Sequence, residues 1–330
     1  MELILHTFGT SISKDNDGFV ITNQNGRKRL SCDGITSIHI GRGVQITSDA
    51  IMLAVEKEIE ILIVEKSGKN YGRIWSHKYG SISTIRKGQL EFASSPKSVG
   101  WIKSVISQKI LNQQALLLAL NGLDMSGSSF VDKAVSRLEE YIVKVKKLKC
   151  ERLFDIAPTL RGWEGNCSKI YFDMLNMFLP EKYRFAVRSQ HPAMDIVNAF
   201  LNYGYGILYG KIEGALIKAG IDPYIGVLHR DEYNRPVLVY DVIELYRVWV
   251  DYVVFHLVKQ DVINEDFYSI NSDGSYWLES LGRRVIIQSM SDYLDEIVEM
   301  DGIKRSRLTH LNVYCKKLAQ EFKGHNDMSH

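Results

Sequence analysis

The chain has 330 residues, which favours two domains, and its 45% hydrophobic and 24% charged residues are typical of a globular protein with a substantial core. The net charge is only +2, so any binding of nucleic acid depends on local clusters of Lys and Arg. The four cysteines are widely spaced, with no Cys-x-x-Cys pair, which argues against a zinc ribbon and against a disulfide scaffold.

No targeting or membrane segment is predicted. The N-terminus lacks the basic region and the apolar run of a signal peptide. The most apolar later stretch, Val248 to Val258, is interrupted by Asp251 and His256 and falls short of the roughly 18 residues that a membrane span needs. We therefore expect a cytoplasmic protein.

Residues 1–82 are predicted to form a small β-rich domain. Short β-branched runs alternate with turn signals such as Asp15–Gly18 and Asn23–Gly26. One helix interrupts the strands and begins at a cap residue, Thr47 or Ser48. The predicted strands are Leu3–Leu5, Phe19–Ile21, Ile35–Ile40 and Ile59–Val64.

Residues 83–330 are predicted to form a larger all-α domain, because apolar residues change to helical spacing near residues 76–92. The fold class is therefore α+β, with the β-rich domain first. The predicted helices are Trp101–Leu120, Val131–Leu148, Trp163–Phe178, Met194–Ile217, Pro236–Leu257, Trp277–Met300 and Ser306–Phe322.

The helix predicted for residues 236–257 is apolar almost all round, yet four charged residues share one face at spacings of 3, 3 and 4. These are Asp241, Glu244, Arg247 and Asp251. Burying carboxylates is costly unless a partner neutralises them. One interpretation is an internal ladder in which Arg247 pairs with Glu244 and Asp251. The other is a cation site that uses Asp241 and Glu244.

Two further residues have an ordinary structural explanation when each is considered alone. His229 ends an apolar run and could bond a carbonyl, and Glu164 could favour the dipole in the first turn of its helix. Together, one His and two or three carboxylates suit a divalent ion, Mg²⁺ or Mn²⁺. Zinc fits less well, because no second His or Cys lies at ligand spacing.

The helix predicted for residues 194–217 contains Asn198 and Asn202 together with several glycines. Glycine costs helix propensity, so we expect another element to pack closely against this helix. The two amides are interpreted as satisfied core groups and not as catalytic residues.

Basic clusters provide candidate DNA contacts, although charge runs are often only solvated faces. Several such clusters near one metal site would bind phosphates without reading sequence. The candidates are Arg161, Arg184, Arg188, Lys146, Lys147, Arg283 and Arg284.

Four blocks, in this order along the chain, resemble a known family. They are Trp163–Gly165 with Tyr171–Phe172, Arg188 with Asn198–Tyr205, Gly220–His229, and Arg235–Pro236 through Asp241 to Glu244. Together they resemble the CRISPR-associated integrase and endonuclease of spacer acquisition, the first-numbered family of Cas proteins. The likeness extends over essentially the whole chain and includes the short N-terminal strands.

The resemblance implies a metal site of Glu164, His229 and Glu244, with Asp241 as an acidic helper among the catalytic residues. Whether Asp241 or Glu244 binds the metal directly stays open, since the third family ligand is often Asp. It also implies Mg²⁺ or Mn²⁺ as cofactor and strand transfer as the reaction, in which a 3′-hydroxyl of short captured DNA attacks a phosphodiester of the CRISPR repeat DNA. The implied partners are a second copy in a homodimer and the small second-numbered Cas protein, contacted through the β-rich domain.

Two alternatives stay open. The chain could be a non-catalytic subunit that only holds DNA in the adaptation complex, or a general metallonuclease unrelated to integration. Loss of joining without loss of binding in Glu164→Ala or His229→Ala would exclude the first. A need for the small partner and the repeat sequence would argue against the second.

Overall fold

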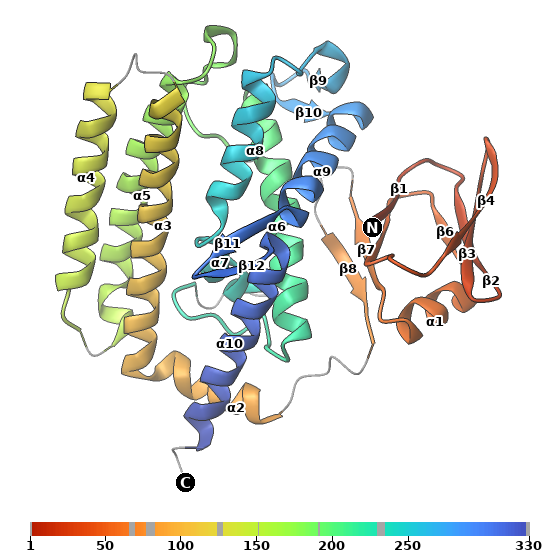
Figure 1. The fold of residues 1–330 in the computed structure, drawn as a ribbon, viewed down its shortest axis with the longest axis horizontal. Coiled ribbons are helices and arrows are strands. Elements are labelled where there is room, and N and C mark those ends of the chain that lie inside the picture. Colours follow the sequence, from red (N-terminus) through yellow and green to blue (C-terminus); the bar gives the residue numbers. More distant parts are fainter. Residues whose placement is uncertain are drawn as a thin grey trace. The chain divides into compact units, whose positions relative to one another are not determined.

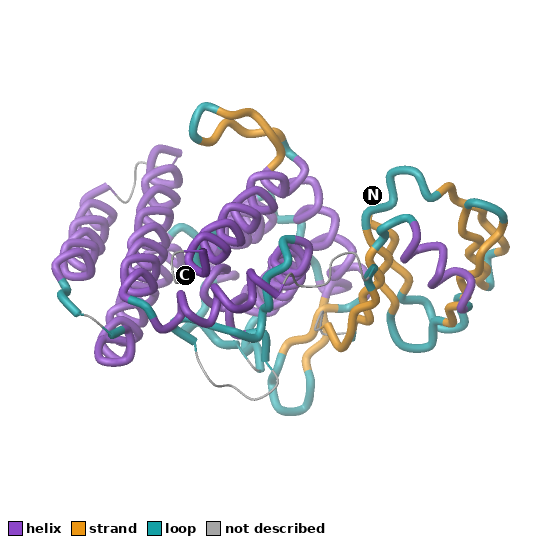
Figure 2. Tube along the Cα trace, turned by 90° about the horizontal axis from the view of Figure 1, so that it is seen from below, coloured by secondary structure: helices purple, strands orange, loops and turns teal. Residues whose placement is uncertain are grey.

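The structure, a computed structural model, describes residues 2–65, 70–76, 83–123, 128–150, 152–190, 192–229 and 235–327. It contains two compact units, Met1–Gly80 and Ser81–His330. Strands dominate the first unit and helices dominate the second (Figures 1 and 2). The fold is mixed α+β, as predicted. The boundary between the two units, after Gly80, lies within residues 76–92, where the spacing of apolar residues becomes helical.

The described residues of the first unit form two four-stranded sheets and one helix. Its elements are β1 (Glu2–Leu5), β2 (Ser11–Asp15), β3 (Gly18–Asn23), β4 (Gly26–Ser31), β5 (Ser37–Ile40), β6 (Gln45–Ile46), α1 (Ser48–Glu56), β7 (Glu60–Val64) and β8 (Asn70–Ile74). One sheet has the order β1-β5-β7-β8 and the other β4-β3-β2-β6. The predicted cap is confirmed, since the Thr47 side chain accepts from Ala50 N at 3.3 Å.

The apolar runs of this unit are buried between its elements. Ile12, Phe19, Ile38 and Ile61 are fully buried, and Leu53 of α1 joins them. β-Branched and aromatic residues of the strands therefore supply the core, and in β3 the consecutive Phe19, Val20 and Ile21 are all buried. Strand β4 escapes that pattern because its sequence, GRKRLS, is polar and mostly exposed.

The second unit is mainly helical. Its elements are α2 (Ser83–Ser94), α3 (Pro96–Leu123), α4 (Ser128–Lys147), α5 (Leu153–Met177), η3 (Glu181–Tyr183), α6 (Ile196–Lys218), α7 (Val237–Ile243), α8 (Arg247–Lys259), η4 (Glu265–Phe267), β9 (Tyr268–Ile270), β10 (Tyr276–Leu278), α9 (Ser280–Asp295), β11 (Ile297–Met300), β12 (Ile303–Ser306) and α10 (Arg307–Asp327).

Two antiparallel hairpins, β9–β10 and β11–β12, correct the all-α prediction for this unit. The helix predicted for residues 277–300 is shorter, since α9 ends at Asp295 and β11 follows. Asp301 and Gly302 have φ values of 53° and 74°, the left-handed conformation that a two-residue hairpin turn requires. The hairpin was missed because its apolar residues are largely exposed.

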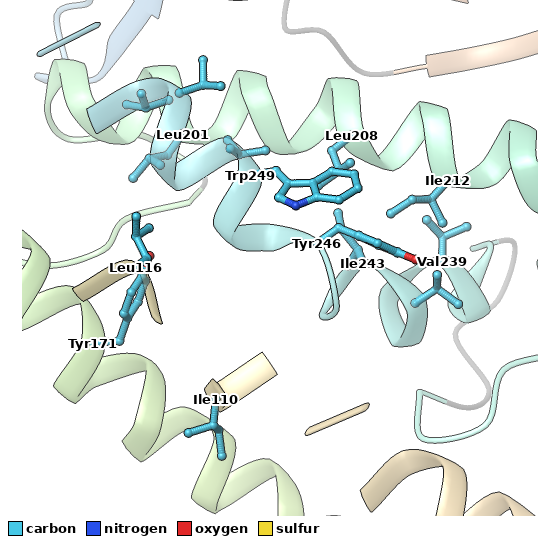
Figure 3. Close-up of a cluster of buried hydrophobic side chains, with 14 of the residues drawn as sticks. Ile110, Leu116, Tyr171, Leu201, Leu208, Ile212, Val239, Ile243, Tyr246 and Trp249 are labelled. Atoms are coloured by element: carbon cyan, nitrogen blue, oxygen red, sulfur yellow. The ribbon is translucent and has the colours of Figure 1, made fainter. Parts of the chain in front are cut away.

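Helix α6 is the centre of the second unit. It packs against α7, α8, α9 and α10, while α3, α4 and α5 pack on one another (Figure 1). The core around it includes the labelled side chains of Leu208, Ile212, Ile243 and Trp249 (Figure 3). The expected close packing is confirmed at Gly204, where a Cβ would lie 2.5 Å from Cγ1 of Val250.

Among the helices described, none is both long and apolar enough to cross a membrane.

Candidate active site

Two glutamates from distant parts of the chain meet at one lysine. Glu164 lies in the middle of α5, and Glu244 lies in the turn between α7 and α8. The Nζ atom of Lys109 on α3 is 2.6 Å from Oε1 of Glu164 and 2.5 Å from Oε2 of Glu244. Two carboxylates separated by 80 residues in sequence therefore share one cation in the interior. Glu164 lies well past the first turn of α5, so the helix-dipole interpretation of this residue is wrong.

The position of Glu244 corrects the single helix predicted for residues 236–257. The chain forms α7 and α8 with a turn at residues 244–246 between them. Arg247, the first residue of α8, places its Nε 2.7 Å from Oε1 of Glu244. Burial alone would raise the pKa of Glu244, but the charges of Arg247 and Lys109 outweigh it and lower that pKa to about 2. Glu244 is therefore a buried anion at any working pH.

Lys109 is the residue of this cluster that the sequence interpretation missed. It is only 4% exposed and lies on α3 in register with the buried Ile102, Ile106 and Ile110. Burial acts to lower its pKa, yet the nearby Glu244 and Glu164 raise it above the ordinary value. A lysine within the apolar stripe of a helix is a detectable signal, because a buried ammonium needs anionic partners.

His229 is held by Asp241. Nδ1 of the ring lies 2.7 Å from Oδ1 of Asp241, so Nε2 is the nitrogen directed to other partners. The fully buried carboxylate of Asp241 also accepts the backbone N–H groups of Val227 (2.7 Å), Leu228 (3.1 Å) and His229 (3.1 Å). Four donors therefore surround Asp241, which suits a group that orients histidine better than a metal ligand.

His229 belongs to the same electrostatic cluster as the two glutamates. Burial lowers the pKa of its imidazole, but the hydrogen bond and charge of Asp241, with the charges of Glu164 and Glu244, raise it overall above 6.5. Glu164 and Glu244 thus share Lys109, His229 bonds Asp241, and the charges of the two glutamates act on the imidazole.

The loop that carries His229 is fixed from two sides. Gln89 of α2 is fully buried, donates to the carbonyls of Asp222 (2.7 Å) and Ile225 (2.9 Å), and accepts from Asp222 N (3.1 Å). Gly226 allows the loop to fold back, because a Cβ there would lie 2.0 Å from the carbonyl oxygen of His229. The imidazole is therefore placed by a buried amide and a glycine as well as by Asp241.

The predicted ion-pair ladder is half correct. Arg247 does pair with Glu244, but Asp251 on α8 accepts the hydroxyl of Tyr171 at 2.8 Å and the hydroxyl of Tyr205. Burial raises the pKa of Asp251 to about 6, although these two hydrogen bonds act in the opposite direction. Asp251 thus belongs to a neighbouring tyrosine network.

A cavity of about 420 Å³ adjoins the glutamate pair. Its lining includes Lys109, Glu164, Glu244 and the guanidinium groups of Arg188 and Arg247. Both guanidinium groups also lie over the ring of Tyr205, at 5.4 and 5.0 Å from its centre. The cavity therefore combines carboxylates with guanidinium groups in one lining.

The contacts of Arg188 also confirm the interpretation of the two asparagines. Arg188 donates to Oδ1 of Asn198 at 2.7 Å and of Asn202 at 2.6 Å. The side-chain amide of Asn198 in turn donates to the Val187 carbonyl at 3.0 Å. These amides are satisfied groups that hold the segment before α6.

The remaining DNA-contact candidates fall into two kinds. Arg184 donates to backbone carbonyls at the end of α5, and Arg283 donates to the Leu278 carbonyl, so both have structural partners. The others lie on exposed helix surface and stay predictions. They are Arg161, Lys146, Lys147 and Arg284.

The cluster fits a divalent ion in donor chemistry. Two carboxylates and one imidazole nitrogen are oxygen and nitrogen ligands suited to Mg²⁺ or Mn²⁺. The two carboxylates already converge on a cation, the Lys109 ammonium. Over the part of the chain that the structure describes, however, no three His, Cys, Asp or Glu side chains are gathered as a ready-made metal site. Glu164, Glu244 and Nε2 of His229 would be the ligands if the Lys109 ammonium left the space between the two glutamates.

The sequence profile of the family described as "CRISPR associated protein Cas1" matches residues 3–292. The chain therefore belongs to this family.

One curated relative is the "CRISPR-associated endonuclease Cas1 1" of Archaeoglobus fulgidus, 29% identical over 316 residues, which are 92% of this chain and 90% of the relative. Among solved structures, a "Casposase bound to integration product" aligns with a TM-score of 0.83 at 19% identity over 98% of this chain and 90% of the other. A chain of a "Cas6-RT-Cas1--Cas2 complex" aligns with a TM-score of 0.79 at 21% identity over 98% of this chain, which spans 35% of that larger chain. The structural likenesses concern the fold.

Proposed function

We propose that this chain is a metal-dependent DNA integrase and endonuclease of CRISPR adaptation, which joins the 3′ end of short captured DNA to the CRISPR repeat. Membership of the family and the endonuclease name of a relative support phosphodiester chemistry. The observation that carries the proposal is the convergence of Glu164 and Glu244 on one cation, together with the effect of their charges on the pKa of His229.

In the proposed site, Glu164, Glu244 and Nε2 of His229 hold Mg²⁺ or Mn²⁺. A divalent ion in that place would neutralise charge on the phosphodiester oxygens and activate the attacking hydroxyl. Asp241 keeps Nδ1 of His229 engaged, so the imidazole presents Nε2 in a fixed direction. Arg247 holds Glu244 in its turn, which limits the motion of that carboxylate.

The positive side chains of the adjoining cavity are proposed to hold the DNA backbone. Arg188 and Arg247 line this cavity together with the two glutamates. Planar guanidinium groups bind phosphate oxygens in a defined geometry. The exposed Arg161 and Arg284, with Lys146 and Lys147, would add phosphate contacts that contribute affinity without sequence reading.

Partners follow from the same family membership. We propose a homodimer that works with the small second-numbered Cas protein, with the first unit making these contacts. One aligned structure is named as a Cas1–Cas2 complex and another as a casposase with its integration product, which supports a DNA-joining assembly.

The test is a joining assay with a supercoiled plasmid bearing a CRISPR repeat, short duplex DNA, the small partner and Mn²⁺. Wild type is compared with Glu164→Gln, His229→Ala and Glu244→Gln, and with Glu140→Gln, which removes an exposed carboxylate on α4. DNA binding is followed by fluorescence anisotropy. We expect joining by wild type and Glu140→Gln only, with binding by all. Binding without joining by wild type would support the DNA-holding alternative, and joining by every variant would overturn the proposed site.

A further inference from the structure

We propose that Lys109 is a built-in substitute for the metal ion: its ammonium holds Glu164 and Glu244 together in the metal-free protein and moves toward Gln113 when a divalent cation binds. The inference rests on the proposed metal site and concerns the lysine, which the proposed reaction does not use.

The Lys109 ammonium lies between the two glutamates. Nζ of Lys109 lies 2.6 and 2.5 Å from one oxygen of each glutamate, which is where a shared cation would bind both carboxylates. A lysine and a metal ion cannot both occupy the same few ångströms between two carboxylates. Binding of the metal therefore requires the ammonium to leave.

The charges around the Lys109 ammonium are balanced when no metal is bound. The contacting groups Lys109, Arg247, Glu164 and Glu244 carry two positive and two negative charges, so this buried group is already neutral. A divalent cation added to it would leave a net charge of +2 in the interior, which is strongly unfavourable at such distances. Movement of the Lys109 ammonium away from the two carboxylates lessens its repulsion of the metal ion, and the phosphates of bound DNA would offset the remaining positive charge.

A buried acceptor for the displaced ammonium lies on the same helix. Gln113 lies one helical turn after Lys109 on α3 and is only 3% exposed. Within the described residues, its buried Oε1 accepts no hydrogen bond, which is costly for a buried carbonyl oxygen. Lys109 and Gln113 line the same cavity, and the flexible four-carbon stem of lysine can rotate into it. An ammonium displaced by metal would satisfy this oxygen.

The consequence is that Lys109 sets the metal affinity of the site. It keeps two buried carboxylates paired when metal is absent, and it opposes metal binding by competing for them. Gln113 lowers the cost of that competition, because it receives the displaced ammonium. Lys109 is accordingly a positioning residue.

The experiment measures the dissociation constant of Mn²⁺ from the free-ion signal in electron paramagnetic resonance. The variants are Lys109→Met, Gln113→Leu and the double variant, and Lys103→Met is the matched control. Lys103 is on the same helix and donates to two carbonyls at the end of α4, away from the glutamates.

We expect Lys109→Met to bind Mn²⁺ about tenfold more tightly or better, because a like charge is removed from the site. Gln113→Leu should bind Mn²⁺ several-fold more weakly, and should have no effect once Lys109 is replaced. Lys103→Met should bind as wild type does. Unchanged or weaker binding by Lys109→Met, in a protein whose Mn²⁺ binding is abolished by Glu244→Gln, would overturn the proposal for Lys109 alone. Failure of both wild type and Lys109→Met to bind Mn²⁺ would overturn the proposed metal site as well.

A second measurement uses only the wild-type protein, in case Lys109→Met does not fold. Lysines are labelled with acetic anhydride with and without Mn²⁺ and are mapped by mass spectrometry. Labelling of Lys109 should be slow without metal and increase with it, while the exposed Lys146 labels equally in both conditions. Unchanged labelling of Lys109 at saturating Mn²⁺ would contradict displacement.

Discussion

The Nδ1 atom of His229 lies 2.7 Å from Oδ1 of Asp241, and the same carboxylate accepts three backbone N–H groups of the loop that ends at His229. This relationship favours Glu244 over Asp241 as the third ligand of the proposed metal site. The oxygens of Asp241 are already engaged by donors, whereas those of Glu244 lie against the cationic side chains of Lys109 and Arg247.

Replacing Asp241 should therefore weaken the site without deleting a ligand. Asp241→Asn exchanges one acceptor oxygen for a donor and disturbs the imidazole, so we expect Mn²⁺ affinity and joining rate to fall about 10- to 100-fold. Calorimetric titration and the joining assay measure the two effects, with the exposed Asp132→Asn on α4 as control. Loss of Mn²⁺ binding as complete as in Glu244→Gln would instead assign Asp241 to the metal.

The joining rate should depend on the protonation of His229. Its pKa is raised above 6.5 because Asp241 outweighs the effect of burial, and only the neutral ring has a lone pair on Nε2. Joining should therefore increase with pH through this raised pKa and then level off. The contribution of the His229–Asp241 pair to folding stability has the opposite pH dependence. It is fully present below the ordinary pKa of histidine and is lost as pH rises through the raised pKa of His229.

Initial rates measured between about pH 5.5 and 9 test this dependence. In Asp241→Asn the midpoint should move to lower pH, since the negative charge is gone. If the pH profile of the joining rate were the same in Asp241→Asn as in wild type, a group other than His229 would be responsible for the titration.

Gly226 should be required for the placement of His229. A methyl group there would lie 2.0 Å from the His229 carbonyl oxygen, so Gly226→Ala must displace the loop. We expect a large loss of joining and of Mn²⁺ affinity in a protein that still unfolds cooperatively. Gly162→Ala on α5 is the control, because within the described residues no atom beyond its chain neighbours and the backbone of its own helix lies within 4 Å of its Cβ position. Wild-type joining by Gly226→Ala would show that the loop position is unimportant.

Asp251 should make stability depend on pH. Its folded-state pKa is raised to about 6 from an ordinary 3.8, so the folded protein binds this proton more tightly than the unfolded chain does. Relative to Asp251→Asn, the wild type should lose about 3 kcal/mol of unfolding free energy as pH rises from below 3.8 through about 6. Urea unfolding of both proteins across this window measures the difference. A difference that stays constant with pH would contradict a titrating Asp251.

The strands were predictable from short apolar runs between turn signals, as at Phe19–Ile21, and most helices from their apolar period, as in α3. The start of α5 was placed ten residues late, since Pro158 lies inside the helix and disfavours it locally. The break between α7 and α8 could not be predicted, because residues 244–246 include no Gly or Pro. It depends on tertiary contacts, including the ion pairs of Glu244 with Lys109 and Arg247.

The site was predictable in part. A histidine and two acidic groups within four recognisable sequence blocks indicated a metal site, which stays a proposal. The structure joins Glu164 to Glu244 through Lys109, and His229 to Asp241. The supporting residues were not found, because Gln89 acts through a contact 133 residues away and Gly226 through a close approach of the backbone. Lys109 had a local signal, its place in an apolar helical stripe.

The most direct test of the account is a crystal structure with Mn²⁺, examined by anomalous scattering at the manganese edge. We predict one strong peak within coordination distance of Glu164, Glu244 and Nε2 of His229, with the Lys109 side chain turned toward Gln113. A peak elsewhere, or none at saturating Mn²⁺ with Lys109 still between the two glutamates, would contradict the proposed metal site.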